Sequence, residues 1–379
     1  MFAQRQTQKM NLLKIPFLQK LALAIVCIIG LGYLLHLGQS ILAPFFLAFL
    51  MAMLFLPIAN FLEYKLKFPR SLSTITSVSL LLIVLTSLLY FFGSQLSSFS
   101  KDIPQLTKQF NLVFHNLQTW VSKTFHININ EQLSYLDQGL KRLLSSTGII
   151  LGFTFGIFSS SLGFTVFFLL FFIFILNYRR VLHSFIVNVF SEKHKASVQE
   201  VVSEVRLMTK QYIIGLCIQI VIMSTLTTIL LTFLGVKYAI LLGVLTGLLN
   251  VIPYIGIAIS LLISCFISFA TGEPSTCIYI AIGYVIIHAI DGNIVLPFVV
   301  GSKVKINALF SFIGILVGEQ LWGISGMFLC IPAIAILKII FERVEELKPW
   351  GKLFGEDEKP HRPKKTYKIS KRITIKEKD

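Results

Sequence analysis

The stretch that decides the fold is Tyr238–Ala270, YAILLGVLTGLLNVIPYIGIAISLLISCFISFA, and Ile306–Phe341 repeats its pattern. Both segments are predominantly apolar and longer than the roughly 20 residues that one membrane crossing needs. Each is interrupted, the first by Asn250-Val-Ile-Pro-Tyr-Ile-Gly256 and the second by Gly318-Glu-Gln-Leu-Trp-Gly323. Backbone breaks and polar groups persist at membrane depth only where they face protein or a polar cavity. Paired broken helices of this kind are typical of a transport site.

The composition of the whole chain is that of a membrane protein. It is 55% hydrophobic and only 14% charged, with a mean hydropathy of +0.78, which excludes a soluble globular domain. The formal net charge of +16 does not indicate nucleic acid, because the basic residues lie at the ends of apolar segments and no recognition motif accompanies them. We therefore expect no nucleic-acid partner.

Neither a cofactor nor a metal is predicted. The five cysteines are single and scattered through apolar segments, where free cysteine packs as a small hydrophobic residue. The spacings of a nucleophile elbow, a phosphate-binding loop or a zinc protease are absent from the sequence. The protein is therefore not expected to be an enzyme.

The expected fold is all-α, a polytopic transmembrane helical protein with broken or re-entrant helices in its C-terminal third. Amphipathic periodicity and charge divide the chain into five regions. These are a cytoplasmic N-terminal segment with three spans (1–93), an amphipathic helical insert on the periplasmic side (94–146), the fourth and fifth spans with a cytoplasmic amphipathic helix (147–236), the transport-site region with two broken helices (237–345), and a basic, disordered cytoplasmic tail (346–379).

Basic residues orient the chain in the membrane. The segment before Leu21 carries four basic residues and no acidic one, so the N-terminus is expected in the cytoplasm, and both topologies below also place the C-terminus there. Two topologies remain for the last third: eight simple crossings, or six crossings and two re-entrant hairpins at the breaks. We prefer the hairpins, because they place Lys303 and Lys305 in the cytoplasm.

Asp291 is the first candidate for a functional group. It is the only acidic residue in the apolar segment Cys277–Gly301, and a carboxylate in the membrane is costly unless it is solvated, paired or protonated. The alternative role for Asp291 is a purely structural hydrogen bond. His288 precedes Asp291 by three residues on the same helical face, and its alternative role is simple packing. The candidate substrate- or ion-binding residues are Asn250, Pro253, Tyr254, Gly256, His288, Asp291, Asn293, Pro297, Gly318, Glu319 and Gln320.

Three runs of the last third resemble the autoinducer-2 exporter (AI-2E) family of permease-like bacterial proteins. They are Asn250-Val-Ile-Pro-Tyr-Ile-Gly256, Asp291-Gly-Asn-Ile-Val-Leu-Pro-Phe-Val-Val-Gly301, and the spaced glycines Gly314, Gly318, Gly323 and Gly326 followed by Ile331-Pro332. The resemblance covers most of the chain and implies a polytopic, oligomeric α-helical protein of the bacterial inner membrane. The activities that it implies are export of the signal autoinducer-2 and, in some members, sodium/proton antiport. Members usually have Gln at His288 and Lys at Phe298, so this chain departs from the family there.

We therefore expect a secondary transporter that exports a small organic solute, such as an autoinducer-2-like signal, by alternating access. Its expected partners are that solute, a proton or sodium ion, the lipid bilayer and further copies of the same chain. A Na⁺(Li⁺)/H⁺ antiporter is one alternative. A non-transporting or channel-like membrane assembly, in which the helix breaks serve only packing, is an alternative of another class.

Overall fold

The computed structural model describes residues 16–125, 147–252, 255–271, 275–295 and 306–355. Within these ranges the regular elements are all helical, as expected from the sequence. The α-helices are α1 (Phe17–Leu37), α2 (Gln39–Asn60), α3 (Arg70–Phe125), α5 (Thr147–Asn177), α6 (Arg179–Val189), α7 (Glu192–Phe233), α8 (Ala239–Leu249), α9 (Ile255–Thr271), α10 (Thr276–Ile290), α11 (Ala308–Arg343) and α12 (Lys348–Phe354). Single π-helical turns follow α2 (Phe61–Lys65) and α10 (Asp291–Val295), and a 3-10 turn (Glu345–Leu347) precedes α12.

Six of the helical segments in the described ranges are long and apolar enough to cross a membrane. They are Phe17–Leu37, Gln39–Lys65, Arg70–Phe99, Glu192–Phe233, Thr276–Val295 and Ala308–Arg343, and a seventh arises if α5 and α6, bent by 72° at their junction, are counted as one span. Many apolar side chains point away from the protein interior, among them Leu262 (70% exposed) and Phe233 (88% exposed). Such a surface is stable only against lipid or other protein, so the polytopic membrane fold is confirmed.

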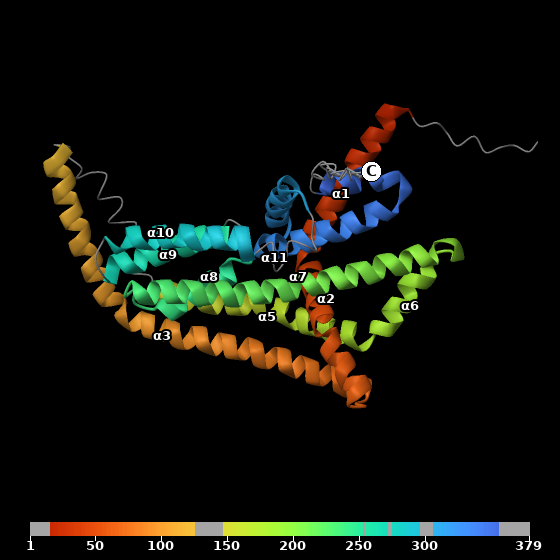
Figure 1. The fold of residues 1–379 in the computed structure, drawn as a ribbon, viewed down its shortest axis with the longest axis horizontal. Coiled ribbons are helices and arrows are strands. Elements are labelled where there is room, and N and C mark those ends of the chain that lie inside the picture. The colour runs from red at the N-terminus through yellow and green to blue at the C-terminus, as the bar shows by residue number, and fades with distance from the viewer. Residues whose placement is uncertain (1–15, 126–146, 253–254, 272–274, 296–305, 356–379) are drawn as a thin grey trace, which may run out of the picture.

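The helix α3 extends well beyond its apolar candidate span, Arg70–Phe99. It continues as one helix from the third span through Pro104 to Phe125, so the expected region boundary at 93/94 lies inside a helix (Figure 1). Its Asp102 pairs with Lys237 and accepts a hydrogen bond from the Tyr238 hydroxyl, both in the turn between α7 and α8. These two partners lower the pKa of Asp102, and the carboxylate raises the pKa of Lys237. The second amphipathic helix predicted for the insert falls outside the described residues.

Three clusters of buried side chains lie along the bundle. The first is formed by α2, α3 and α5, and its fully buried centre includes Ala48, Ala59 and Phe172. The second is formed by the C-terminal half of α7 with α8, α9 and α10, around Met223 and Tyr284. A third cluster joins the N-terminal half of α7 to α2 and α11. The 42-residue helix α7 therefore connects the α8–α10 group, at one end of the molecule, to the rest (Figure 1).

The first predicted break is present and reverses the chain. The helix α8 ends at Leu249 after 11 residues, about half of a membrane crossing, and α9 begins at Ile255. Thr246 on α8 and Ser264 on α9 both hydrogen-bond to the hydroxyl of Tyr284. In one continuous helix these residues would be about 27 Å apart, so the segment folds back as a hairpin.

The helix α8 also approaches α7 closely. A Cβ atom at Gly243 or Gly247 would collide with the side chains of Thr228 or Ser224 and with the backbone of α7. Small residues spaced by four allow such close helix packing in membranes. The Gly243-Val-Leu-Thr-Gly247 run therefore positions the polar break that follows it against α7.

The second predicted break lies inside α11. Trp322 and Gly323 leave the helical conformation, and Gly323 has a φ of +59°, which an L side chain rarely adopts. A Cβ atom at Gly318 or Gly326 would collide with the backbone of the other glycine. Eight residues span about 12 Å in a straight helix, so this contact requires the chain to fold back. The Trp322 indole anchors the reversal by donating to the Leu35 carbonyl at 2.8 Å.

Candidate functional site

Asp291 lies where α10 changes into a π-helical turn. It is the C-cap residue of α10 and the first residue of the turn Asp291–Val295. Its side chain is only 6% exposed, and it is the one buried acidic or basic side chain in the part of the chain that the structure describes. Single π-helical turns widen a helix locally and are frequent at functional sites. Asp291 follows the buried residues Ile287 and Tyr284 by four and seven positions, so it lies on the face of α10 that points into the α7–α10 group.

Two neutral amide groups hold the carboxylate. The Gln219 Nε2 atom on α7 donates to both oxygens of Asp291, at 2.9 and 3.2 Å. The Asn250 Nδ2 atom, at the end of α8, donates to Oδ2 at 2.9 Å. Gln219 and Asn250 are themselves buried, at 5% and 7% exposure. Among the described residues, the ion pairs do not include Asp291, so its partners there are hydrogen-bond donors and not an opposite charge.

A second polar layer lies beside this one. The hydroxyl of Tyr284 makes hydrogen bonds with Thr246 Oγ1 at 2.9 Å and with Ser264 Oγ at 2.7 Å. Tyr284 precedes Asp291 by two helical turns on α10, and Thr246 precedes Asn250 by one turn on α8. All three hydroxyl residues are buried. The interior of the α8–α10 group thus contains two consecutive layers of hydrogen-bonded polar side chains.

The structure brings together two of the residues predicted for the site, Asn250 and Asp291. It leaves His288 and Asn293 exposed, and the Asn293 amide donates back to the Ala289 carbonyl at 2.8 Å. The prediction that His288 and Asp291 share a helical face is wrong, because the buried face of α10 passes through Tyr284, Ile287 and Asp291 and leaves His288 exposed.

The remaining predicted residues belong to the two breaks. Glu319 is exposed and accepts a hydrogen bond from Gln320, which is also exposed. Gly256 and Gly318 are buried, and a Cβ atom at either would meet backbone of the adjoining arm. Both glycines therefore serve the close packing of the hairpins. Pro253, Tyr254 and Pro297 lie outside the described residues.

Sequence reasoning missed Gln219 and the hydroxyl layer. Gln219 is the single amide in the apolar run Ile213–Phe233, and a lone amide in a membrane helix is a signal of the same kind as Asp291. Its partner was not readable, because Gln219 and Asp291 are 72 residues apart and meet only through the packing of α7 against α8 and α10. Ser, Thr and Tyr are common in membrane helices, so Thr246, Ser264 and Tyr284 carried no distinct signal.

Replacing Tyr284 by Phe should lower the thermal stability of the purified protein. The change keeps the ring and removes the hydroxyl that bonds to both Thr246 and Ser264. Thr246 keeps its bond to the Leu242 carbonyl, but the buried Ser264 hydroxyl loses this partner, at a cost of about 1–3 kcal/mol. Tyr279→Phe is the matched control, because Tyr279 lies on the same helix and is 60% exposed. Equal melting temperatures for the two variants would show that the hydroxyl layer does not stabilise the hairpin.

The fold and the buried polar layers define a class of protein. Broken membrane helices that enclose a carboxylate and amides at the reversal of the chain are the architecture of membrane transporters. Packing of the protein interior alone does not require a buried ionisable group such as Asp291.

Comparison with known proteins agrees with this class. The model of the AI-2E family transporters matches residues 22–346, so the chain belongs to the AI-2E family. It is 22% identical to "Putative transport protein YueF" of Bacillus subtilis (strain 168) over 320 residues, 82% of this chain and 85% of YueF. It is 21% identical to "AI-2 transport protein TqsA" of Escherichia coli (strain K12) over 335 residues, 86% of this chain and 94% of TqsA.

A shorter match has higher identity. The chain is 32% identical to "Putative transport protein YrrI" of Bacillus subtilis (strain 168) over 129 residues, which are 34% of this chain and 36% of YrrI. That match spans about a third of each protein. The family assignment rests on the family model, which matches residues 22–346, and the protein is a multi-pass membrane transporter.

Proposed function

We propose that this transporter exports a small organic solute by alternating access and that Asp291 carries the proton or the cationic charge that is exchanged during transport. The observation that carries the proposal is the buried carboxylate that, among the described residues, is held by the amides of Gln219 and Asn250. A carboxylate without an opposite charge is expensive inside a membrane protein. Binding of a proton, a cation or a polar substrate there lowers this cost.

The amide partners suit a group that changes its charge. An amide presents an N–H₂ donor on one side and a carbonyl acceptor on the other. Gln219 and Asn250 can therefore donate to the ionised carboxylate and, after rotation of an amide, accept from the protonated one.

The separate cores support the alternating-access mechanism. The α8–α10 group packs on the C-terminal half of α7, whereas α2, α5 and the first part of α3 share a core of their own; farther along, α3 also contacts the α8–α10 group through Phe99. Elements with distinct cores can move as rigid bodies against one another. We propose that the α8–α10 hairpin group moves against this scaffold and exposes the Asp291 layer to each side in turn.

The first substrate to test is autoinducer-2 (AI-2), because the relative TqsA is named an AI-2 transport protein. We also propose a bacterial inner-membrane location with cytoplasmic termini, because positive charge is concentrated before Leu21 and at the α5–α6 junction. The assembly of several copies belongs to the same proposal, since α1 is apolar and its span is not buried within one chain.

The test is flux in proteoliposomes that contain the purified full chain. A gradient of labelled autoinducer-2 should dissipate faster than in protein-free liposomes. The rate of dissipation should depend on the pH of the solution on the side of the vesicle membrane to which Asp291 is exposed. Flux of sodium against protons with no flux of the organic solute would contradict solute export and identify an antiporter. No flux of either, at verified insertion, would overturn the transport mechanism proposed for this site.

A further inference from the structure

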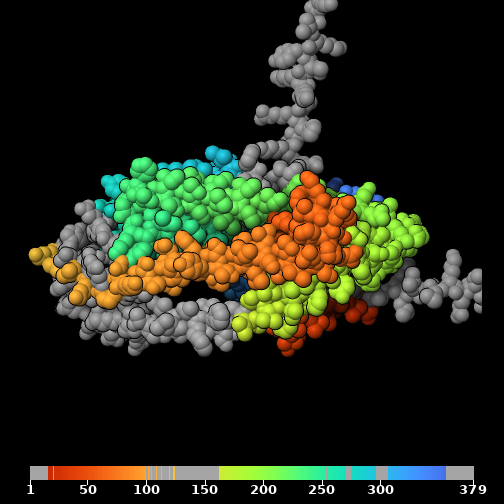
Figure 2. All heavy atoms as spheres, turned by 90° about the horizontal axis from the view of Figure 1, so that it is seen from below, coloured from red at the N-terminus to blue at the C-terminus, as the bar shows by residue number. Residues whose placement is uncertain are grey.

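A pocket distant from the Asp291 layer lies between α6 and the start of α3. Its volume is about 750 Å³. It is lined by Arg70, Arg180, Val181, Ser184, Phe185, Asn188 and Val189. Six of these seven residues come from α6 and its first turn, and Arg70 begins α3. In the space-filling view the yellow-green region of α6 lies beside the orange-red region where α2 ends and α3 begins (Figure 2).

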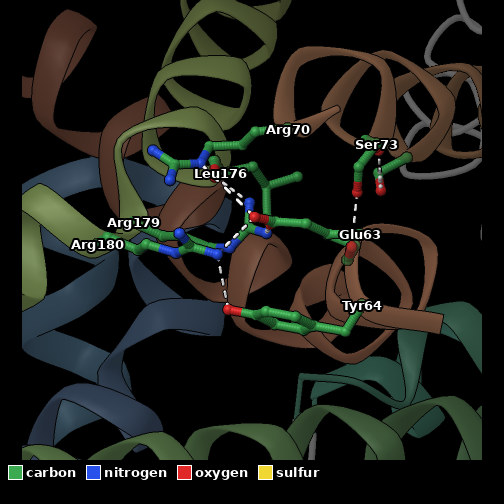
Figure 3. A network of polar contacts seen from close by, with 9 residues as sticks. Glu63, Tyr64, Arg70, Ser73, Leu176, Arg179 and Arg180 are labelled. Carbon is green, nitrogen blue, oxygen red and sulfur yellow. Dashed lines mark hydrogen bonds and ion pairs between the residues drawn. The ribbon is translucent and has the colours of Figure 1, made fainter. Parts of the chain in front are cut away.

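The pocket lies at a cluster with excess positive charge. Glu63, in the turn after α2, pairs with Arg179 and with Arg180, whose Nη2 atom is 2.5 Å from Oε1, while the Arg70 Nε atom is 3.9 Å from the same oxygen (Figure 3). One carboxylate thus faces three guanidinium groups, which leaves a local charge of about +2. Arg70 has the longest of these contacts, and its buried Nε atom makes no hydrogen bond within the described structure.

The wall that α6 contributes has two parallel stripes. Arg180, Ser184 and Asn188 follow each other at intervals of four residues and form a polar stripe, in which Asn188 donates to Ser184 at 3.0 Å. The second stripe is apolar and is shifted by one residue; it consists of Val181, Phe185 and Val189. The pocket therefore offers cations and hydrogen-bond donors next to an apolar surface.

The position of α6 fits the membrane interface. It begins where the apolar span of α5 ends and is turned by 72° from that span. Its apolar side chains Phe185 and Val189 are exposed, so the helix has the character of one that lies in the plane of the lipid headgroups. Basic pockets next to membrane-spanning helices recognise anionic headgroups at this level.

From these observations we infer that the α3–α6 pocket binds an anionic glycerophospholipid, with its phosphate on Arg70 and Arg180 and its acyl chains along Val181, Phe185 and Val189. The local charge of about +2 selects an anionic headgroup over a zwitterionic one. The apolar stripe selects a lipid over a soluble phosphate, because a free anion would leave that stripe uncovered.

The experiment measures the melting temperature of the delipidated, full-length protein in detergent. It is titrated in separate arms with phosphatidylglycerol, with phosphatidylcholine of the same acyl chains, and with inorganic phosphate. We expect phosphatidylglycerol to raise the melting temperature of the wild type and the other two to have little effect. Arg70→Gln should require roughly fivefold more phosphatidylglycerol for the half-maximal shift, since each basic residue at the membrane surface contributes about that factor.

Arg206→Gln is the matched control, because Arg206 is an exposed arginine on α7 that does not line the pocket. It should titrate as the wild type does. If Arg70→Gln fails to fold, Ser184→Leu with Asn188→Leu tests the same pocket at exposed positions without removing charge, and it too should weaken the response. Equal stabilisation by phosphatidylcholine or by inorganic phosphate, or an unchanged titration in the pocket variants, would overturn the lipid site.

Discussion

Replacing Asp291 by Asn should reduce solute flux at least about tenfold, which corresponds to a loss of roughly 1.4 kcal/mol or more in the transport step. The substitution keeps the volume of the side chain and most of its capacity for hydrogen bonds with Gln219 and Asn250. It removes the group that can ionise. The folded hairpin should therefore persist while the exchange of charge stops, which separates a functional carboxylate from a structural one.

The pH series is the decisive part of this measurement. In the wild type the flux should change with pH because the proton on Asp291 is gained and lost during the cycle. In Asp291→Asn any residual flux should no longer follow the pH, because no group titrates at that position. Flux is normalised to the amount of inserted protein for each variant.

Glu346→Gln provides the control for loss of one negative charge. Glu346 is exposed in the 3-10 turn before α12 and lies outside the proposed site. Its flux and pH dependence should match those of the wild type. Wild-type flux with unchanged pH dependence in Asp291→Asn would remove Asp291 from the transport mechanism.

Replacing Gly326 by Ala should destabilise the protein by about 1–3 kcal/mol, the usual cost of inserting a methyl group where no space exists. The added Cβ atom would collide with the backbone of Gly318 in the opposite arm of α11. Backbone atoms cannot rotate away as a side chain can, so the hairpin must open for the methyl group to fit. The measurement is the melting temperature in detergent, together with the fraction of protein that elutes as a single species.

Gly163→Ala on α5 is the matched control. A Cβ atom at Gly163 meets no heavy atom within 4 Å in the described structure. Alanine is also the better helix former, by up to about 1 kcal/mol. This variant should therefore melt at the wild-type temperature or above it. Equal destabilisation by both substitutions would mean that the contact between Gly318 and Gly326 is not the reason for the effect.

Several structural features were readable from the chain because a membrane penalises irregular backbone and ionisable groups wherever they occur. Asn250–Gly256 and Gly318–Gly323 interrupt overlong apolar segments, and both segments do break there and fold back. The same penalty singled out Asp291 and Asn250, and in the structure the Asn250 Nδ2 atom donates to Asp291 Oδ2 at 2.9 Å. These conclusions depend on local composition and hydropathy, which tertiary packing does not alter.

Other features depended on contacts that no local pattern records. Gln219 reaches Asp291 because α7 packs against α10, although the two residues are 72 positions apart in the chain. The inward direction of Asp291 follows from its place on the buried face of α10 with Tyr284 and Ile287, a face that helix packing selects and that leaves His288 exposed. Likewise Glu63, Arg70, Arg179 and Arg180 gather from three separate segments into one charged cluster.

The difference has a physical origin. The cost of a polar or backbone-breaking residue in lipid is a property of that residue, so the number of apolar segments, their breaks and the buried carboxylate follow from the chain alone. The partner that relieves this cost can come from any helix that packs nearby, and packing is chosen by the complementarity of surfaces far apart in sequence. The three-dimensional fold therefore decided that, in the part of the chain that the structure describes, the partners of Asp291 are two amides.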